Sequence, residues 1–243
     1  MSKTPAQEHA ATEFLRSTDL TYQECTHGIA QLDRLIVNVS STMADQARSY
    51  LLPCLYAYWE RYYRILFGEF LRCVSLADVR MDNGNVKLVQ YRVSRELRSR
   101  LALQRVKALE ELAHVGDVLS TRTFLSDLVT WLDTPLSFSD PEKWIITTPN
   151  VQFKVLENMC NAVGLDIRDL KQALDERKPS LHEGLQELVL ERNRIAHGES
   201  FEKVDQHTWE RLKNFLLDLM NALQWFLYEA LRTKINNSLD KTC

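Results

Sequence analysis

Glycine and proline are scarce in this sequence, with seven of the first and six of the second among 243 residues. Because these two residue types mark most turns and irregular segments, their scarcity argues against long stretches of coil. Strong helix formers such as leucine, alanine, glutamate, arginine and glutamine are abundant instead. A hydrophobic content of 45% can supply a sizeable core. The composition therefore favours a chain rich in helix, and its length allows one large domain or two small ones.

Cysteine is also used sparingly, and its pattern excludes a disulfide framework. The five cysteines are odd in number and contain no Cys-x-x-Cys pair; they are Cys25, Cys54, Cys73, Cys160 and Cys243. This pattern indicates reduced thiols in a cytoplasmic protein. The first residues lack the apolar segment of a signal peptide, and no apolar run approaches the roughly 18 residues of a membrane span.

The sequence also lacks the motifs of the commonest cofactor and metal sites. Its six histidines are scattered, with no HExxH pair and no cluster with cysteine. No glycine-rich phosphate loop and no serine nucleophile elbow is present. We therefore expect no metal and no cofactor.

A strong positive charge is absent as well, since the formal net charge is −3. This value argues against a broad surface that coats nucleic acid. One part of the chain nevertheless has a local excess of arginine. The best candidates there for contacts to an RNA backbone are Arg92, Arg95 and Arg98. An ordinary solvated helix face would carry the same residues, so both interpretations stay open.

Apolar residues recur at helical spacing along most of the chain. A long helix is expected over 43–76, with Trp59 in its apolar stripe and a kink or break at Pro53. Residues 78–93 contain Asn83-Gly84 followed by alternating apolar residues, which predicts a short hairpin or a loose insertion. The ends, 1–10 and 237–243, are expected to fray, and 133–149 is expected to be a loop anchored by residues 144–146. Further helices are predicted over 12–39, 94–115, 121–132, 151–163, 166–177, 180–197 and from 205 or 208 to 236.

The helix predicted over 180–197 carries the most informative pattern. Ser180 followed three residues later by Glu183 is a capping box, and Gly198 suits the left-handed position after a helix. The apolar stripe should be buried, yet the helix ends in Arg192, Asn193, Arg194 and His197, which are costly to bury without partners.

Arg192 and His197 combine two chemistries that cleave phosphodiesters. A guanidinium donates paired hydrogen bonds to phosphate oxygens, and an imidazole exchanges protons near neutral pH. The five-residue spacing places the two side chains roughly 140° apart around an ideal helix. One helix therefore does not easily aim both groups at one atom, whereas two copies about a two-fold axis could bring both into one cleft.

Three segments together resemble the HEPN superfamily. RNRIAHG (192–198) is similar to the Arg-Asn-x-x-x-His signature of HEPN domains. LLPCLYAYWERYYRILFGEFL (51–71) and TPNVQFKVLENMCNAVGLD (148–166) resemble segments of the stand-alone prokaryotic branch that includes RiboL-PSP-HEPN proteins. The resemblance spans about residues 30–235. It implies one all-α domain, a HEPN-type helical bundle over residues 1–243, with the hairpin or insertion at 78–93 as an addition.

The resemblance also implies an activity and partners. Many HEPN members are metal-independent endoribonucleases that dimerise through this motif, leave 2′,3′-cyclic phosphates, and act in toxin–antitoxin, abortive-infection and other anti-phage systems. On that basis a second copy, RNA, and an antitoxin or sensor protein are the expected partners. Other members have lost catalysis and serve as adaptor or nucleotide-binding modules in larger complexes.

The candidate site residues follow from the signature. Arg192, Asn193 and His197 are the catalytic candidates, with Glu191 and Arg194 as neighbours in a supporting role. Glu60 is a further supporting candidate, because a carboxylate beside Arg192 or His197 would orient it. The purely structural alternative is a buried pair between the signature and Glu60 or Glu191.

Overall fold

The computed structural model describes residues 5–77, 79, 86–95, 137–138, 140–146, 150–175, 179–198 and 203–239. Every regular element in these ranges is a helix, so the all-α prediction is confirmed. Within the same ranges, no helix is both long and apolar enough to cross a membrane. The elements are α1 (Pro5–Val37), α2 (Ser41–Leu76), the 3-10 helix η2 (Pro141–Trp144), α5 (Phe153–Ala162), α6 (Arg168–Asp175), α7 (Leu181–Ala196) and α8 (Gln206–Leu239), with residues 86–95 also helical.

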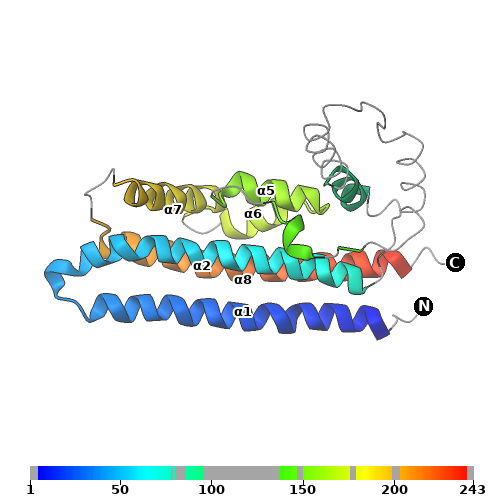
Figure 1. The fold of residues 1–243 in the computed structure, drawn as a ribbon, viewed down its shortest axis with the longest axis horizontal. Coiled ribbons are helices and arrows are strands. Elements are labelled where there is room, and N and C mark those ends of the chain that lie inside the picture. The colour runs from blue at the N-terminus through cyan, green and yellow to red at the C-terminus, as the bar shows by residue number, and fades with distance from the viewer. Residues whose placement is uncertain are drawn as a thin grey trace, which may run out of the picture.

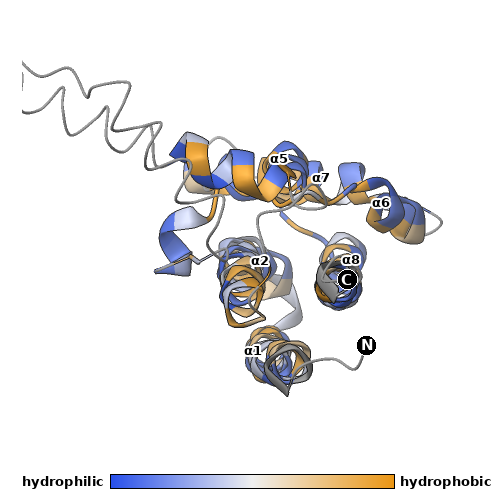
Figure 2. Cartoon of the chain, turned by 90° about the vertical axis from the view of Figure 1, so that its right-hand side faces the viewer, coloured by the Kyte–Doolittle hydropathy of each residue, from blue (hydrophilic) through white to orange (hydrophobic). Residues whose placement is uncertain are grey.

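The helices form two layers. The long helices α1, α2 and α8 lie along the molecule and pack as a triangle when viewed end-on, and α5, α6 and α7 lie above α2 and α8 (Figures 1 and 2). The two chain termini lie at one end. The carboxyl end of α7 lies at the other end, beside the start of α8 and the turn between α1 and α2 (Figure 1).

Helix α2 is the centre of the bundle, and its buried face is aromatic. Trp59, Tyr62 and Tyr63 are fully buried, which confirms the packing role predicted for this stripe. The ring of Tyr63 lies 5.8 Å from that of Trp59, a separation that suits tilted aromatic pairs. The helix runs unbroken through Pro53, so the break allowed for at this residue is absent.

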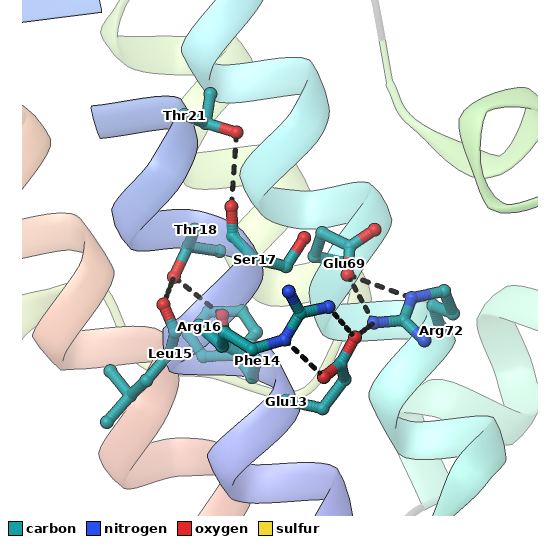
Figure 3. Close-up of polar contacts among 9 residues, drawn as sticks. All are labelled: Glu13, Phe14, Leu15, Arg16, Ser17, Thr18, Thr21, Glu69 and Arg72. Carbon is teal, nitrogen blue, oxygen red and sulfur yellow. Dashed lines mark hydrogen bonds and ion pairs between the residues drawn. The ribbon is translucent and has the colours of Figure 1, made fainter. Parts of the chain in front are cut away.

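Ion pairs add to the contact between α1 and α2. Glu13 of α1 accepts two hydrogen bonds of 2.8 Å from Arg16, and Arg72 of α2 bridges Glu13 to Glu69 (Figure 3). The hydrogen bonds from Arg16, with the charges of both arginines, lower the pKa of Glu13 to about 2. The carboxylate therefore stays charged at every physiological pH, and this end of α1 stays attached to α2 by opposite charges.

Helix α7 packs unusually closely on α8. A Cβ atom at Gly184 would lie 2.5 Å from the ring of Phe215, so only glycine fits between these helices as they stand. Further along the same face, Glu187 of α7 forms a two-armed ion pair with Arg211 of α8. These contacts fix where the carboxyl end of α7 points.

Three predictions about local structure need correction. Residues 86–93 are helical, so the hairpin is wrong there, while residues 80–85 lie outside the described ranges. The helix expected to begin at Ser94 is already formed at residue 86. Residues 5–10 and 237–239, which were expected to fray, belong to α1 and α8. The predicted helices over 96–115 and 121–132 lie outside the described ranges.

The last part of the predicted loop 133–149 is tied to the core as expected. Ile145 is buried, and the backbone carbonyl of Ile146 accepts a 2.9 Å hydrogen bond from the hydroxyl of Tyr63. The ring of Trp144 packs edge-on against Phe138 at 5.3 Å. Ile146 is thereby held against α2.

Candidate functional site

The sequence determines both ends of α7, the helix that carries the signature. Ser180 and Glu183 form the predicted capping box, in which Glu183 accepts a 3.2 Å hydrogen bond from the Ser180 backbone N–H. His197 is the C-cap, and its backbone N–H donates to the Asn193 carbonyl at 2.9 Å. Gly198 follows with φ of +67°, the left-handed conformation that a residue with a Cβ rarely adopts.

Arg192 is half-buried, and an aromatic ring rather than a carboxylate lies beside it. Its Cζ atom lies 5.4 Å from the centroid of the Tyr56 ring on α2, within the range of a cation–π contact. Its Nη1 donates a 2.9 Å hydrogen bond to Oδ1 of Asn193. Within the described part of the chain, no acidic side chain forms an ion pair with it, so its charge is available to a ligand.

Tyr56 is itself firmly held. It is 2% exposed, and its hydroxyl accepts a 2.6 Å hydrogen bond from the backbone N–H of Val151. The carbonyl of the same Val151 accepts a 2.8 Å hydrogen bond from the indole of Trp59. Burial raises the pKa of the Tyr56 phenol, so it stays neutral at physiological pH. Two neighbouring aromatic side chains of α2 thus satisfy both backbone groups of Val151, which lies two residues before α5 begins.

His197 is exposed at the end of α7, and its ring forms no hydrogen bond or ion pair with any described residue. It lies at the carboxyl end of α7, where the helix dipole is negative. The buried pair of Arg192 and His197 with Glu60 or Glu191, which the purely structural alternative invoked, is therefore not formed among the described residues. Both groups of the signature are accessible to solvent or to a second chain.

The acidic candidates have other partners. Glu60 forms a 2.5 Å ion pair with Arg64, so the predicted pairing with Arg192 or His197 is not formed. Glu191 forms a 3.0 Å ion pair with Arg194 within α7. Glu60 nevertheless lies one helical turn from Tyr56 on α2, on the same face of that helix.

The candidate RNA-binding arginines lie on a different part of the molecule. Arg95 lies 5.9 Å from the centroid of the Tyr91 ring and donates a hydrogen bond to the Lys143 carbonyl, so its guanidinium is engaged within the chain. Arg92 is half-buried on the same helical stretch, and Arg98 lies outside the described residues. Contact between these arginines and RNA stays a prediction.

Sequence reasoning placed Tyr56 only in the packing stripe of α2 and missed its contact with Arg192. The available signal was its place in the segment 51–71, the second of the three segments that resemble the family.

In the ranges that the structure describes, no group of histidine, cysteine, aspartate and glutamate side chains is arranged to hold a metal ion.

Comparison with known families adds one match. The model of the RiboL-PSP-HEPN family matches residues 29–228, which is most of the chain. The match includes α2, α5 and α7, and so includes Tyr56, Val151, Arg192 and His197. No curated protein and no solved structure matches the chain.

Proposed function

The chain belongs to the RiboL-PSP-HEPN family, within the HEPN superfamily, and on that premise we propose that it is a metal-independent endoribonuclease. The observation that carries the proposal is the state of the two signature groups. An exposed imidazole and a guanidinium without an acidic partner among the described residues lie at the same end of α7. A site for a negatively charged phosphodiester requires both of these features.

Arg192 is assigned to the scissile phosphate. A guanidinium presents five N–H donors, and Arg192 uses one of them on Asn193 within the described chain, which leaves four. Paired donation to two phosphate oxygens would neutralise the charge that builds up in the transition state. Asn193 is assigned to hold the guanidinium, because its amide oxygen already accepts that hydrogen bond.

His197 is assigned to proton transfer. The 2′-oxygen of a ribose attacks the adjacent phosphorus, a new O2′–P bond forms, and the bond from phosphorus to the 5′-oxygen breaks. An imidazole takes the proton of the 2′-hydroxyl as a general base or gives one to the leaving 5′-oxygen as a general acid. The products are a 2′,3′-cyclic phosphate and a free 5′-hydroxyl.

We assign phosphate binding and proton transfer to residues of two different chains in a dimer. Because Arg192 and His197 diverge around one helix, two copies related by a two-fold axis would bring a guanidinium of one chain near an imidazole of the other. Glu60, Glu191 and Arg194 would support the electrostatics of the shared cleft. A nuclease of this kind fits a toxin or anti-phage effector that an antitoxin or sensor protein controls.

The reaction class is tested with the purified protein, a transfer-RNA mixture and excess EDTA. We expect cleavage in EDTA, with fragments whose 3′ ends resist tailing until a phosphatase that opens cyclic phosphates is added. Heat-inactivated protein is the control for contaminating ribonuclease. Intact RNA after incubation with a stable dimer would contradict the proposal, and would instead favour an adaptor or nucleotide-binding module of a larger complex.

A further inference from the structure

The contact between Arg192 and Tyr56 is unlike those of the other arginines nearby. Arg64, Arg194 and Arg211 each form an ion pair with a glutamate, whereas Arg192 has the face of a buried phenol ring at 5.4 Å. We propose that Tyr56 is the positioning residue that aims the Arg192 guanidinium at its anionic substrate. This inference rests on the proposed nuclease function, because it explains how one group of that site is held.

An aromatic ring is a suitable holder for a substrate-binding guanidinium. A carboxylate partner would restrain Arg192 equally well, but it would occupy the N–H donors and oppose the approach of a phosphate. The ring face attracts the cation through its quadrupole and takes no hydrogen-bond donor. Tyr56 therefore restricts where the guanidinium lies and leaves its charge and donors to the substrate.

The ring can act as a holder only because it is fixed at its far end. Val151 donates to the hydroxyl at 2.6 Å, and the Val151 carbonyl is bound by Trp59 at 2.8 Å. Tyr56 and Trp59 are three residues apart on α2, so both side chains reach the same segment before α5. The ring is thus packed between this segment and α7, and a displacement of either would move the guanidinium.

Two substitutions separate the ring from the hydroxyl. Tyr56→Phe keeps the aromatic face under Arg192 and loses only the bond to Val151, whereas Tyr56→Leu removes the face. We expect kcat for a labelled single-stranded oligoribonucleotide to fall about tenfold in Tyr56→Leu, with KM less affected, and to stay within about twofold in Tyr56→Phe. Rescue by phenylalanine distinguishes positioning by the ring from a role of the hydroxyl.

Tyr63→Leu is the matched control. Tyr63 lies two turns further along α2, is equally buried, and also bonds a backbone group of the segment before α5, but no described guanidinium lies over its ring. Its replacement should lower the melting temperature while leaving kcat of the folded protein unchanged. A loss of kcat in Tyr63→Leu as large as that in Tyr56→Leu would overturn the proposal.

A spectroscopic measurement makes the test independent of catalysis. The Arg192 Nε–Hε cross-peak, assigned by its loss in Arg192→Lys, should carry an upfield shift from the Tyr56 ring current. We expect it to move downfield in Tyr56→Leu and to stay in place in Tyr56→Phe and Tyr63→Leu; a cross-peak that Tyr56→Leu leaves unmoved would overturn the proposal. If the parent protein cuts no RNA but the cross-peak moves, the positioning of Arg192 stands and only the nuclease function fails.

Two aromatic residues of similar volume at position 56 provide a further test if Tyr56→Leu does not fold. Phenylalanine and pentafluorophenylalanine at position 56 have nearly the same size, but fluorination removes the negative face of the ring. The fluorinated protein should show the lower kcat and the displaced Arg192 cross-peak. Equal kcat and equal cross-peaks in the two proteins would overturn the proposal.

Discussion

Lys234 is a buried lysine on α8, and its burial lowers its pKa. It is 8% exposed, and burial, together with the positive charge of Lys87, lowers its pKa from 10.5 to about 8. In the unfolded chain the same amine keeps its ordinary pKa, so at neutral pH folding costs the free energy of charging it in the core. The difference between 10.5 and about 8 corresponds to roughly 3 kcal/mol.

Replacing Lys234 with methionine should therefore stabilise the protein at neutral pH. We expect Lys234→Met to raise the free energy of unfolding by up to about 3 kcal/mol at pH 7. Because the lysine becomes neutral in the folded state above pH 8 and in the unfolded state above pH 10.5, this advantage should shrink between those values. Urea unfolding at pH 7, 9 and 10.5 measures it, and an equal difference at all three would contradict the assignment.

Lys213 provides the control for that experiment. It is a second buried lysine of α8; burial alone would lower its pKa, but hydrogen bonds to Asp33 and Glu210 outweigh burial and raise it. A raised pKa means that the charged form contributes stability below pH 10.5, and that this contribution is lost as the amine deprotonates in the folded protein. Lys213→Met should therefore destabilise the protein at pH 7, the opposite sign to Lys234→Met.

At the scale of single residues, the sequence supplied candidates for the site but not the contacts that they make. Arg192, Asn193 and His197 could be selected from one motif because the motif lies within one helix. The partners of Glu60 and Arg192 depend on which rotamers α2, α5 and α7 allow when packed together. Local sequence does not contain that information, so the Tyr56 contact was missed and the Glu60 contact was wrong.

At the scale of elements, the capping box is the local signal on which the start of α7 depends. The side chains of Ser180 and Glu183 each accept a backbone hydrogen bond of the other residue. We expect Ser180→Ala to lower the free energy of unfolding by about 1 kcal/mol, the usual value for a lost N-cap. Thermal or urea unfolding measures this loss.

Ser40 offers a matched control for the cap. It is the N-cap residue of α2, with extended backbone angles like those of Ser180, but its side chain makes no capping hydrogen bond. Ser40→Ala should therefore change stability by only a few tenths of a kcal/mol. If both substitutions cost the same, the capping box does not stabilise α7 in the way that its geometry indicates.

The corrected elements show why other local signals failed. Val86 and Leu88 alternate as in a strand, but the buried residues are Leu88 and Tyr91, three apart, while Val86 is 44% exposed. The spacing of the buried apolar residues is therefore helical. The prediction gave more weight to the turn signal of Asn83-Gly84 than to this spacing. Pro53 removes one backbone hydrogen bond, yet α2 continues because Leu52, Leu55 and Tyr56 around it are buried.

At the scale of the whole molecule, the fold class could be predicted because it depends on composition and on apolar periodicity along every long helix. The arrangement of the helices could not, since it depends on close contacts such as Gly184 against Phe215 and on the aromatic face of α2. This arrangement brings Tyr56, Arg192 and the segment before α5 together, far apart as they are in sequence.

The most direct test of the proposed nuclease is the rate at which His197→Ala cuts RNA, measured beside the parent protein at equal protein concentration in EDTA. The account predicts a rate lower by roughly a hundredfold or more, the usual contribution of a general acid or base, with an unchanged elution volume. His27→Ala, which alters an exposed histidine of α1, a helix separated from α7 by α2 (Figure 1), should cut at the parent rate. A His197→Ala protein that cuts RNA as fast as the parent would contradict the account.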